Sequence, residues 1–357
     1  NPLGAHSAGV RSGCCATTSA WSHRGNSTTT RSTRSRRSCS KQAWTPGVKK
    51  RTRSRTSVIM YTVLAAMTPG LVAQIYFLGF GVLLNGILLC LWCLLFEATI
   101  VLLRRPANLR AELNRHLGDG STVLTAWLIA VCLPPDLPAG VLAIAALAAV
   151  GLAKHAYGGL GQNVFNPAMV GYAVILLSFP ALMATYPSVH TDGLSGATLL
   201  SDFRYRPATT VAEFMPGAAA AHFQASVTAG MFFLGGLWLL FRRIISWRIP
   251  TAVLLTVGIL AAATYDQGSS QSLGSPWFHW TTGGTIAAAF FFATDPVTHP
   301  ANPRHQLLFG CLIGSILFVI RTGASLPDGI AFAILLANCT TPRLNRMHQR
   351  SRQAVLE

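Results

Sequence analysis

Charged side chains are scarce in this sequence of 357 residues: 11% of the residues are charged, whereas 51% are hydrophobic. Because soluble globular domains carry about 25% charged residues, this composition excludes an ordinary water-soluble protein. Negatively charged residues are scarcer than positively charged ones, with 11 Asp and Glu against 28 Lys and Arg. The composition therefore predicts a membrane protein whose surroundings are largely lipid.

Residues 1–57 contain no acidic residue but hold 12 of the 28 Lys and Arg residues. The segment also lacks apolar periodicity, an initiator Met and the apolar run of a signal peptide. A basic segment could contact nucleic acid or anionic lipid, but one that cannot bury a core is expected to be disordered. We assign it no function and predict membrane lipid, not nucleic acid, as a partner of the chain.

The cysteines and histidines lack the spacing of a metal or disulfide site. Of the eight cysteines, three lie in the basic segment and five lie inside apolar runs. Cys90 and Cys93 have a C-x-x-C spacing, but inside an apolar run they are expected to pack as small hydrophobic residues. We therefore predict no metal site.

Ten apolar segments have about the length needed to cross a bilayer as helices. They are residues 58–77, 79–103, 120–134, 139–156, 166–183, 225–241, 249–264, 281–294, 306–322 and 327–341. Several adjoin Pro- and Gly-rich turns, which indicates short or broken helices that are sheltered inside the protein.

The distribution of basic residues predicts the orientation of these spans. If the first span starts in the cytoplasm, the inner loops and the C-terminal end contain thirteen Lys and Arg residues, against three in the outer loops. Both termini are then cytoplasmic, including a tail at residues 343–357. The one long outer loop comprises residues 184–224.

The sequence resembles itself at a shift of 160 residues. PAMVGYAVILLS, which begins at Pro167, aligns with PDGIAFAILLAN, which begins at Pro327, and these segments belong to spans five and ten. Two repeats of five spans have opposite orientations, so we predict an all-α membrane protein of two inverted five-helix repeats at 58–183 and 225–342. This architecture fits a channel or transporter as well as an electron carrier.

The predicted outer loop contains a D-x-x-S-G-A-T motif made of Asp192, Ser195, Gly196, Ala197 and Thr198. The small residues before the threonine would leave its hydroxyl accessible on a tight turn. The motif is similar to the recognition sequence of the transferase that joins FMN to a threonine hydroxyl through a phosphoester bond. The alternative is an ordinary turn.

Longer segments resemble one family, the RnfD/NqrB family, and fit its Rnf branch better. They are GGLGQNVFNPAMVGYAVILLSFP (158–180), VLAAMTPG (63–70), GGTIAAAFFFATDPVT (283–298) and RTGASLPDGIAFAILLAN (321–338). The resemblance covers residues 56–342 in order and leaves out residues 1–55.

The resemblance implies FMN on Thr198 and a second, non-covalent flavin, riboflavin, within the membrane part. It implies a subunit of an ion-translocating ferredoxin–NAD oxidoreductase in a bacterial inner membrane, which relays electrons and is coupled to Na⁺ or H⁺ movement, with the Thr198 loop periplasmic. The implied partners are the other Rnf subunits (A, B, C, E and G) and the flavin transferase. The chain has no motif for NAD or for an iron–sulfur cluster, so we predict no catalytic residue and no complete active site on it.

Polar residues at the predicted inner ends of spans five and eight are candidates for a flavin or ion site. The amides of Asn163 and Asn166 could bind a flavin ring, whereas Asn166 before Pro167 also fits a helix N-cap. Asp295 either binds a ligand or begins a turn.

Two other acids lie in or beside apolar spans. Glu97 is the only acid deep in a span, and it is a functional candidate unless Arg104 and Arg105 neutralise it. Asp328 is expected to cap span ten. Two alternatives to a flavin carrier remain, a channel or transporter without a redox cofactor and a membrane scaffold that has lost its cofactor.

Overall fold

The computed structural model describes residues 55–157, 161–186, 198–206, 208–324, 326 and 328–356. Most of the basic segment and four residues of the flavin motif, Asp192, Ser195, Gly196 and Ala197, lie outside this part of the chain. The described residues are mainly helical.

Helices of the first half follow the first five predicted spans. They are α1 (Arg55–Leu78), α2 (Gly81–Leu103), α4 (Ser121–Ala130), α5 (Ala139–Leu147) continued by the π-helix η1 (Ala148–His155), and α6 (Pro167–Ser178) followed by α7 (Pro180–Met183). A short helix, α3 (Leu109–Gly118), lies between α2 and α4. Hydropathy did not predict α3, because none of its residues is buried.

Helices of the second half cover the other five predicted spans, and two short elements lie in the connections outside these spans. They are α8 (Leu199–Arg204), α9 (Val211–Phe241), α10 (Arg248–Ala263), the 3₁₀ turn η2 (Asp266–Gly268), α11 (Pro276–Thr281), α12 (Thr285–Ala287) continued by the π-helix η3 (Ala288–Phe292), α13 (Pro303–Gly323) and α14 (Ile330–Leu356). The predicted tail from residue 343 therefore continues α14 as helix to Leu356.

Among the residues that the structure describes, four helices, α1, α2, α9 and α13, are long and apolar enough to cross a membrane. Three shorter apolar segments, at 139–155, 167–178 and 248–263, accompany them. The length and composition of these helices confirm the predicted all-α membrane fold.

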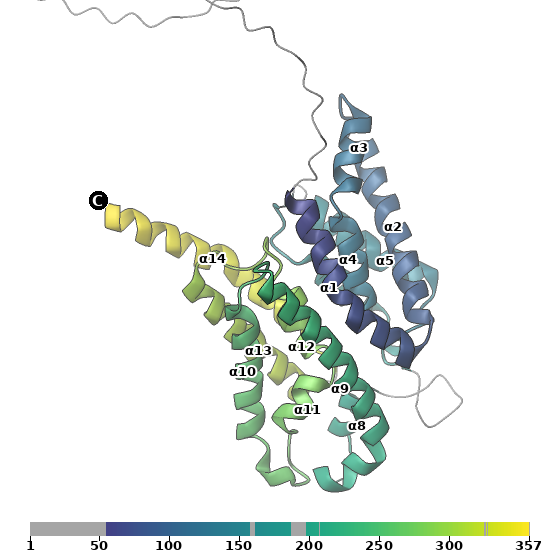
Figure 1. The fold of residues 1–357 in the computed structure, drawn as a ribbon, viewed down its shortest axis with the longest axis vertical. Helices are drawn as coiled ribbons and strands as arrows, with labels where there is room; N and C mark the ends of the chain where they lie inside the picture. The colour runs from purple at the N-terminus through teal and green to yellow at the C-terminus, as the bar shows by residue number, and fades with distance from the viewer. Residues whose placement is uncertain are drawn as a thin grey trace, which may run out of the picture. The chain divides into compact units, whose positions relative to one another are not determined.

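The two halves repeat one packing order. In the first half α2 packs against α4 and α5, and α5 with η1 packs against α6. In the second half α10 packs against α11 and α13, and α13 packs against α14. Contacts of α1 with α9 and of α6 with α14 join the halves, and Figure 1 shows α1 beside α9. This arrangement agrees with the internal repeat predicted from the sequence.

Helix α9 begins at Val211, well before the expected start of its span at residue 225. Thr210 and Glu213 form a capping box, in which each side chain accepts the backbone N–H of the other. The following Ala-rich stretch has high helix propensity. The helix therefore extends into the predicted outer loop of residues 184–224, because a cap and strong helix formers continue it beyond the apolar run.

Candidate functional site

Thr198 is the N-cap of α8. Its Oγ1 accepts the N–H of Ser201 at 3.2 Å, and its hydroxyl donates to Ser201 Oγ at 2.9 Å. A small apolar cluster of Leu200, Phe203 and Phe278 holds α8 against α11. The chain thus fixes the position of Thr198 through the helix that follows it.

Thr198 lines a cavity of about 270 Å³ between helices of both halves. Other polar residues that line it are Gln74, Cys132, Tyr172, Tyr186, Gln224, Thr228, Thr281, Thr282 and Asp328. The volume is near the lower end of the range of roughly 300–1,000 Å³ that is usual for small-molecule sites. The cavity combines a largely apolar wall with a few hydrogen-bonding groups, as such sites generally do.

Gln74 leaves an unused acceptor at this cavity. Its Nε2 donates to the carbonyl of Val131 at 3.0 Å, but its buried Oε1 has no hydrogen-bond partner among the described residues. An unsatisfied buried acceptor costs about 1–3 kcal/mol. A ligand that brings an N–H or O–H group to Gln74 would remove this cost.

A buried ion pair lies behind the same cavity. The guanidinium of Arg321 binds the carboxylate of Asp328 with two contacts of 3.0 Å, and it also donates to Thr285 Oγ1 at 2.6 Å and to the carbonyl of His279 at 3.0 Å. Gly284 N–H donates to Asp328 at 3.1 Å. The expected helix-capping role of Asp328 is therefore wrong, because its carboxylate binds Arg321 and the start of α12 instead. Arg321, which the charge distribution assigned to an outer loop, is buried inside α13.

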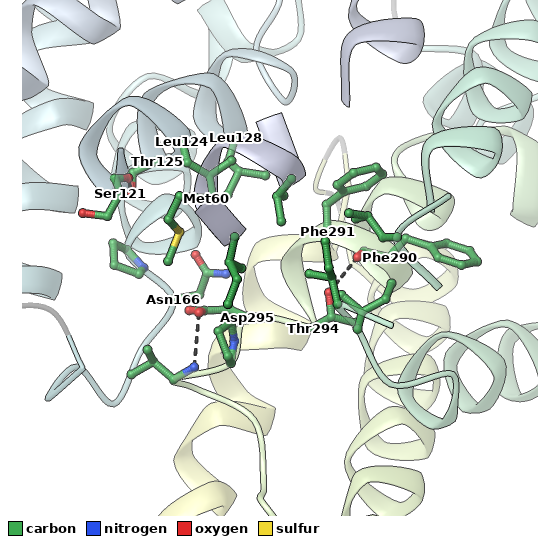
Figure 2. A pocket seen from close by; sticks show the side chains of 18 of the residues that line it. Met60, Ser121, Leu124, Thr125, Leu128, Asn166, Phe290, Phe291, Thr294 and Asp295 are labelled. Atoms are coloured by element: carbon green, nitrogen blue, oxygen red, sulfur yellow. Dashed lines mark hydrogen bonds between the residues drawn. The ribbon is translucent and has the colours of Figure 1, made fainter. Parts of the chain in front are cut away.

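A second cavity, of about 120 Å³, contains all three candidate residues of the predicted inner side. Asn163, Asn166 and Asp295 line it together with Thr294 and Lys154. Figure 2 shows Asn166 and Asp295 on one side of this cavity and Phe290 and Phe291 on the other. The fold thus brings together residues that are about 130 positions apart in the sequence.

Asn166 has a structural role at this cavity. Its Oδ1 accepts the N–H groups of Ala168 and Met169, which confirms the predicted N-cap of α6. Its Nδ2 donates to the carbonyl of Phe292 in η3 at 3.0 Å. Asn163 donates only to a nearby backbone carbonyl, and its buried Oδ1 has no partner among the described residues. Asn163 is therefore the amide with an acceptor left for a ligand.

Asp295 begins the turn that follows η3. Its carboxylate accepts the N–H of Val297 and the hydroxyl of Thr298, both at 3.3 Å, as expected for a residue that starts a turn. Burial raises the pKa of Asp295, and these hydrogen bonds only partly oppose the shift. Its role as a ligand stays a prediction.

Glu97 is fully buried at the centre of a cluster of ionisable groups. Its Oε2 accepts from Lys154 Nζ at 3.0 Å and from Thr122 Oγ1 at 3.3 Å. Its Oε1 lies 3.2 Å from His116 Nδ1 and 2.9 Å from His155 Nε2. Lys154 belongs to this cluster and also lines the second cavity, so the two adjoin each other.

The expectation that Arg104 and Arg105 neutralise Glu97 was wrong. Arg104 instead donates to the carbonyl of His155. The compensating charge comes from Lys154, which the charge distribution assigned to an inner loop, since η1 packs against α2 and places this lysine inside the protein. Sequence spacing could not show this pairing, because Lys154 is 57 positions from Glu97.

Comparison with known proteins identifies the family. The model of the NQR2, RnfD, RnfE family matches residues 45–353. The chain belongs to the NQR2, RnfD, RnfE family.

Three relatives in this family are 37–39% identical to the chain over the aligned residues. One is the D subunit of the ion-translocating oxidoreductase complex of Cellvibrio japonicus, 38% identical over 81% of this chain and 88% of the relative. The protein of the same name from Yersinia pseudotuberculosis serotype O:1b is 39% identical over 82% and 93%, and that from Ectopseudomonas mendocina is 37% identical over 82% and 90%.

Several residues of the first cavity escaped sequence reasoning. Gln74, Tyr172 and Tyr186 come from three separate segments and carry no local motif, so only the packing of the helices brings them together. Tyr172, Arg321 and Asp328 do lie in the segments that resemble the RnfD/NqrB family. A basic and an acidic residue seven positions apart, such as Arg321 and Asp328, could have indicated a buried ion pair.

Proposed function

We propose that this chain is a flavin-carrying membrane subunit of an ion-translocating oxidoreductase complex, with FMN joined to Thr198 through a phosphoester bond. The observation that carries the proposal is the position of Thr198, whose hydroxyl is fixed by α8 at the edge of a cavity with unused hydrogen-bonding capacity. The names of the family relatives support the same kind of complex.

The residues of this chain would bind and orient the flavin. Bound FMN supplies the ability to take up and release one or two electrons. Gln74 offers an acceptor to a ring N–H, and Tyr172 and Thr282 offer hydroxyl groups in the same cavity. The buried Arg321–Asp328 pair holds the Gly284 backbone in the wall. The apolar remainder of the lining excludes water from the ring.

The second cavity is the place that suits the implied riboflavin best. Asn163 leaves an unused acceptor there, and Asp295 and Thr294 add polar groups opposite aromatic side chains. At about 120 Å³ the cavity lies below the usual range of about 300–1,000 Å³, so a flavin would enter only if the surrounding helices separate.

In this proposal the subunit relays electrons across a bacterial inner membrane, and the complex couples their transfer to Na⁺ or H⁺ movement. Both termini are cytoplasmic and Thr198 is periplasmic. The partners are the other subunits of the Rnf-type complex (A, B, C, E and G) and the flavin transferase that modifies Thr198. The two cavities, one at Thr198 and one at Asn166 and Asp295, would then lie on the path between donor and acceptor subunits.

The decisive experiment is mass spectrometry of the peptide that contains Thr198, on full-length chain produced together with the transferase. We expect the mass of a covalently attached FMN and a fluorescent band in a denaturing gel. Thr198→Val should lose both, whereas Thr209→Val, the same change nearby, should keep them. An unmodified wild-type peptide would overturn the proposal.

The same variants separate the alternatives. A channel or transporter without a cofactor would give no fluorescent band in any variant. A scaffold that has lost its cofactor would keep the electron-transfer activity of the assembled complex in Thr198→Val. The proposed flavin carrier should lose this activity while the complex still assembles.

A further inference from the structure

Outside the two flavin cavities, three donor groups converge at one point of the first half. The carboxylate of Glu97 in α2, the imidazole of His116 in α3 and the imidazole of His155 in η1 each offer one ligand atom, and these atoms all lie within 4.8 Å of one another. Three separate helical elements thus supply the set of one carboxylate and two imidazoles that zinc sites often use.

The distances suit a shared metal ion. Glu97 Oε1 lies 2.9 Å from His155 Nε2 and 3.2 Å from His116 Nδ1. Ligand atoms of a tetrahedral ion with bonds of 2.0–2.1 Å are separated by about 3.3 Å. Two of the three ligand separations are therefore close to the required value, and the third, between the two imidazole nitrogens, is within 4.8 Å.

The surroundings of His155 point to a missing ligand. Its side chain is 3% exposed, and neither ring nitrogen has a hydrogen-bond partner among the described residues, although Nε2 lies next to Glu97. A buried polar atom without a hydrogen bond is unfavourable in a folded protein. A metal ion placed between His155 Nε2 and Glu97 Oε1, which lie 2.9 Å apart, would bind the lone pair of Nε2, which no hydrogen bond among the described residues uses.

The groups around the three ligands have the arrangement of a second coordination layer. Lys154 and Thr122 bind Oε2 of Glu97, which orients the carboxylate and leaves Oε1 for a metal ion. On the other side, His116 Nε2 lies 3.6 Å from Glu112 Oε2, the carboxylate–histidine pairing usual behind a metal-bound imidazole. Glu112 is itself paired with Arg115 at 3.1 Å, which holds its carboxylate in place beside His116.

We propose that Glu97, His116 and His155 bind a divalent first-row transition metal ion of the Zn²⁺ type. Imidazole and carboxylate ligands favour such ions over Mg²⁺ or Ca²⁺. His116, 18% exposed, marks the side from which the ion and a water molecule as fourth ligand reach the site. The bound ion ties α3, which buries no residue of its own, to α2 and η1. This site does not depend on the proposed flavins.

The test uses the full-length chain, purified in detergent with an affinity tag free of histidine and stripped with a chelator. Titration with Zn²⁺ against a chromophoric chelator should give one tightly bound ion per chain. His116→Ala and His155→Ala should each weaken binding by at least about tenfold, whereas His305→Gln, a histidine distant from the cluster in sequence, should bind as wild type does.

Two further measurements separate metal binding from misfolding. Helicity by circular dichroism should stay unchanged in His116→Ala, whose side chain is partly exposed, and Zn²⁺ should raise the Tm of the wild type but not of this variant. Co²⁺ in the wild-type chain should give visible absorption bands typical of four-coordinate cobalt. A wild-type chain that leaves Zn²⁺ with the chelator, or a folded His116→Ala that binds equally well, would overturn the site.

Discussion

Asn166 caps α6 and also binds the carbonyl of Phe292 in the other half of the chain. The capping role could be predicted, because Asn before Pro is a common start of a helix. The contact with Phe292 could not, since the two residues are 126 positions apart and no local pattern records it. A substitution at Asn166 removes both contacts, so a comparison with a residue that only caps a helix shows how much the long-range contact adds to stability.

Asn166→Ala should destabilise the protein more than loss of a cap alone. Removing the cap costs about 1 kcal/mol, and the buried Phe292 carbonyl left without a donor adds about 1–3 kcal/mol. Asn108→Ala is the matched control, because Asn108 caps the exposed helix α3 and makes only that contact in the described part of the chain. Denaturant unfolding in detergent measures both, and equal losses would contradict the role of the Phe292 contact.

Asp295→Asn should stabilise the protein at neutral pH. Because burial raises the pKa of Asp295 in the folded state, its ionisation reduces stability as pH rises above the unfolded value of about 3.9. Asn keeps an acceptor for Val297 N–H and does not ionise, so the gain should shrink as pH falls toward 4. Unfolding midpoints across pH measure it, with the exposed Asp136→Asn as control. A gain that is independent of pH would contradict the assigned cause.

At the scale of secondary structure elements, the most extensive contact between the halves in the described part of the chain is that of α1 with α9. Gly235 of α9 is buried against α1, and a Cβ at this position would collide with the backbone carbonyl of Ala66. The absence of a side chain therefore sets how near the two helices lie. Close approach at a small residue is common between membrane helices.

Gly235→Ala should separate α1 from α9 and lower the stability by about 1–3 kcal/mol, the usual range for overpacking. Gly230→Ala is its control on the same helix, because a Cβ there meets no atom within 4 Å. This control should be neutral or slightly stabilising, since Ala favours helix by up to about 1 kcal/mol over Gly. Thermal unfolding in detergent measures both variants. Equal Tm values would contradict the prediction, because they would show that α1 and α9 adjust to the added methyl group without loss of stability.

The sequence predicted the membrane helices well and the short elements poorly, for one physical reason. Apolar runs follow from the need to satisfy the backbone in lipid, so α1, α2 and α13 could be located from hydropathy alone. Helices α3 and α8 depend on the capping side chains of Asn108 and Thr198 and on packing, which hydropathy does not report. The π-helical turns η1 and η3 likewise depend on tertiary contacts.

The candidate site divides in the same way. Thr198, Asn163, Asn166 and Asp295 could be named because short motifs or helix ends mark them. The Glu97 cluster could not be assembled, since its partners come from α3 and η1 and have no fixed spacing along the sequence. A single sequence identifies residues with unusual local chemistry, but their neighbours require the fold.

For the whole molecule, the distribution of basic residues predicts a definite orientation. In a variant without native cysteines, Ser270→Cys should react with a membrane-impermeant maleimide in intact spheroplasts, because its loop is expected to be periplasmic. Asn114→Cys in α3 should react only after the membrane is opened. Both positions are exposed in the folded chain, so accessibility to the reagent reports the side of the membrane. The reverse pattern would invert the topology.

The π-helix η3 contributes to both cavities: Phe290 and Phe291 line the one at Asn166 and Asp295, whereas Phe292 lines the one at Thr198. Consecutive residues of one short π-helix therefore line both cavities, and all three aromatic side chains are buried. Electrons can tunnel through buried apolar groups over short distances, but a hydrated cation cannot enter such a region without losing its water, at a cost of many kcal/mol. Under the proposed function, electrons would pass η3 but cations would not, so electrons and cations would have to cross the subunit by separate routes.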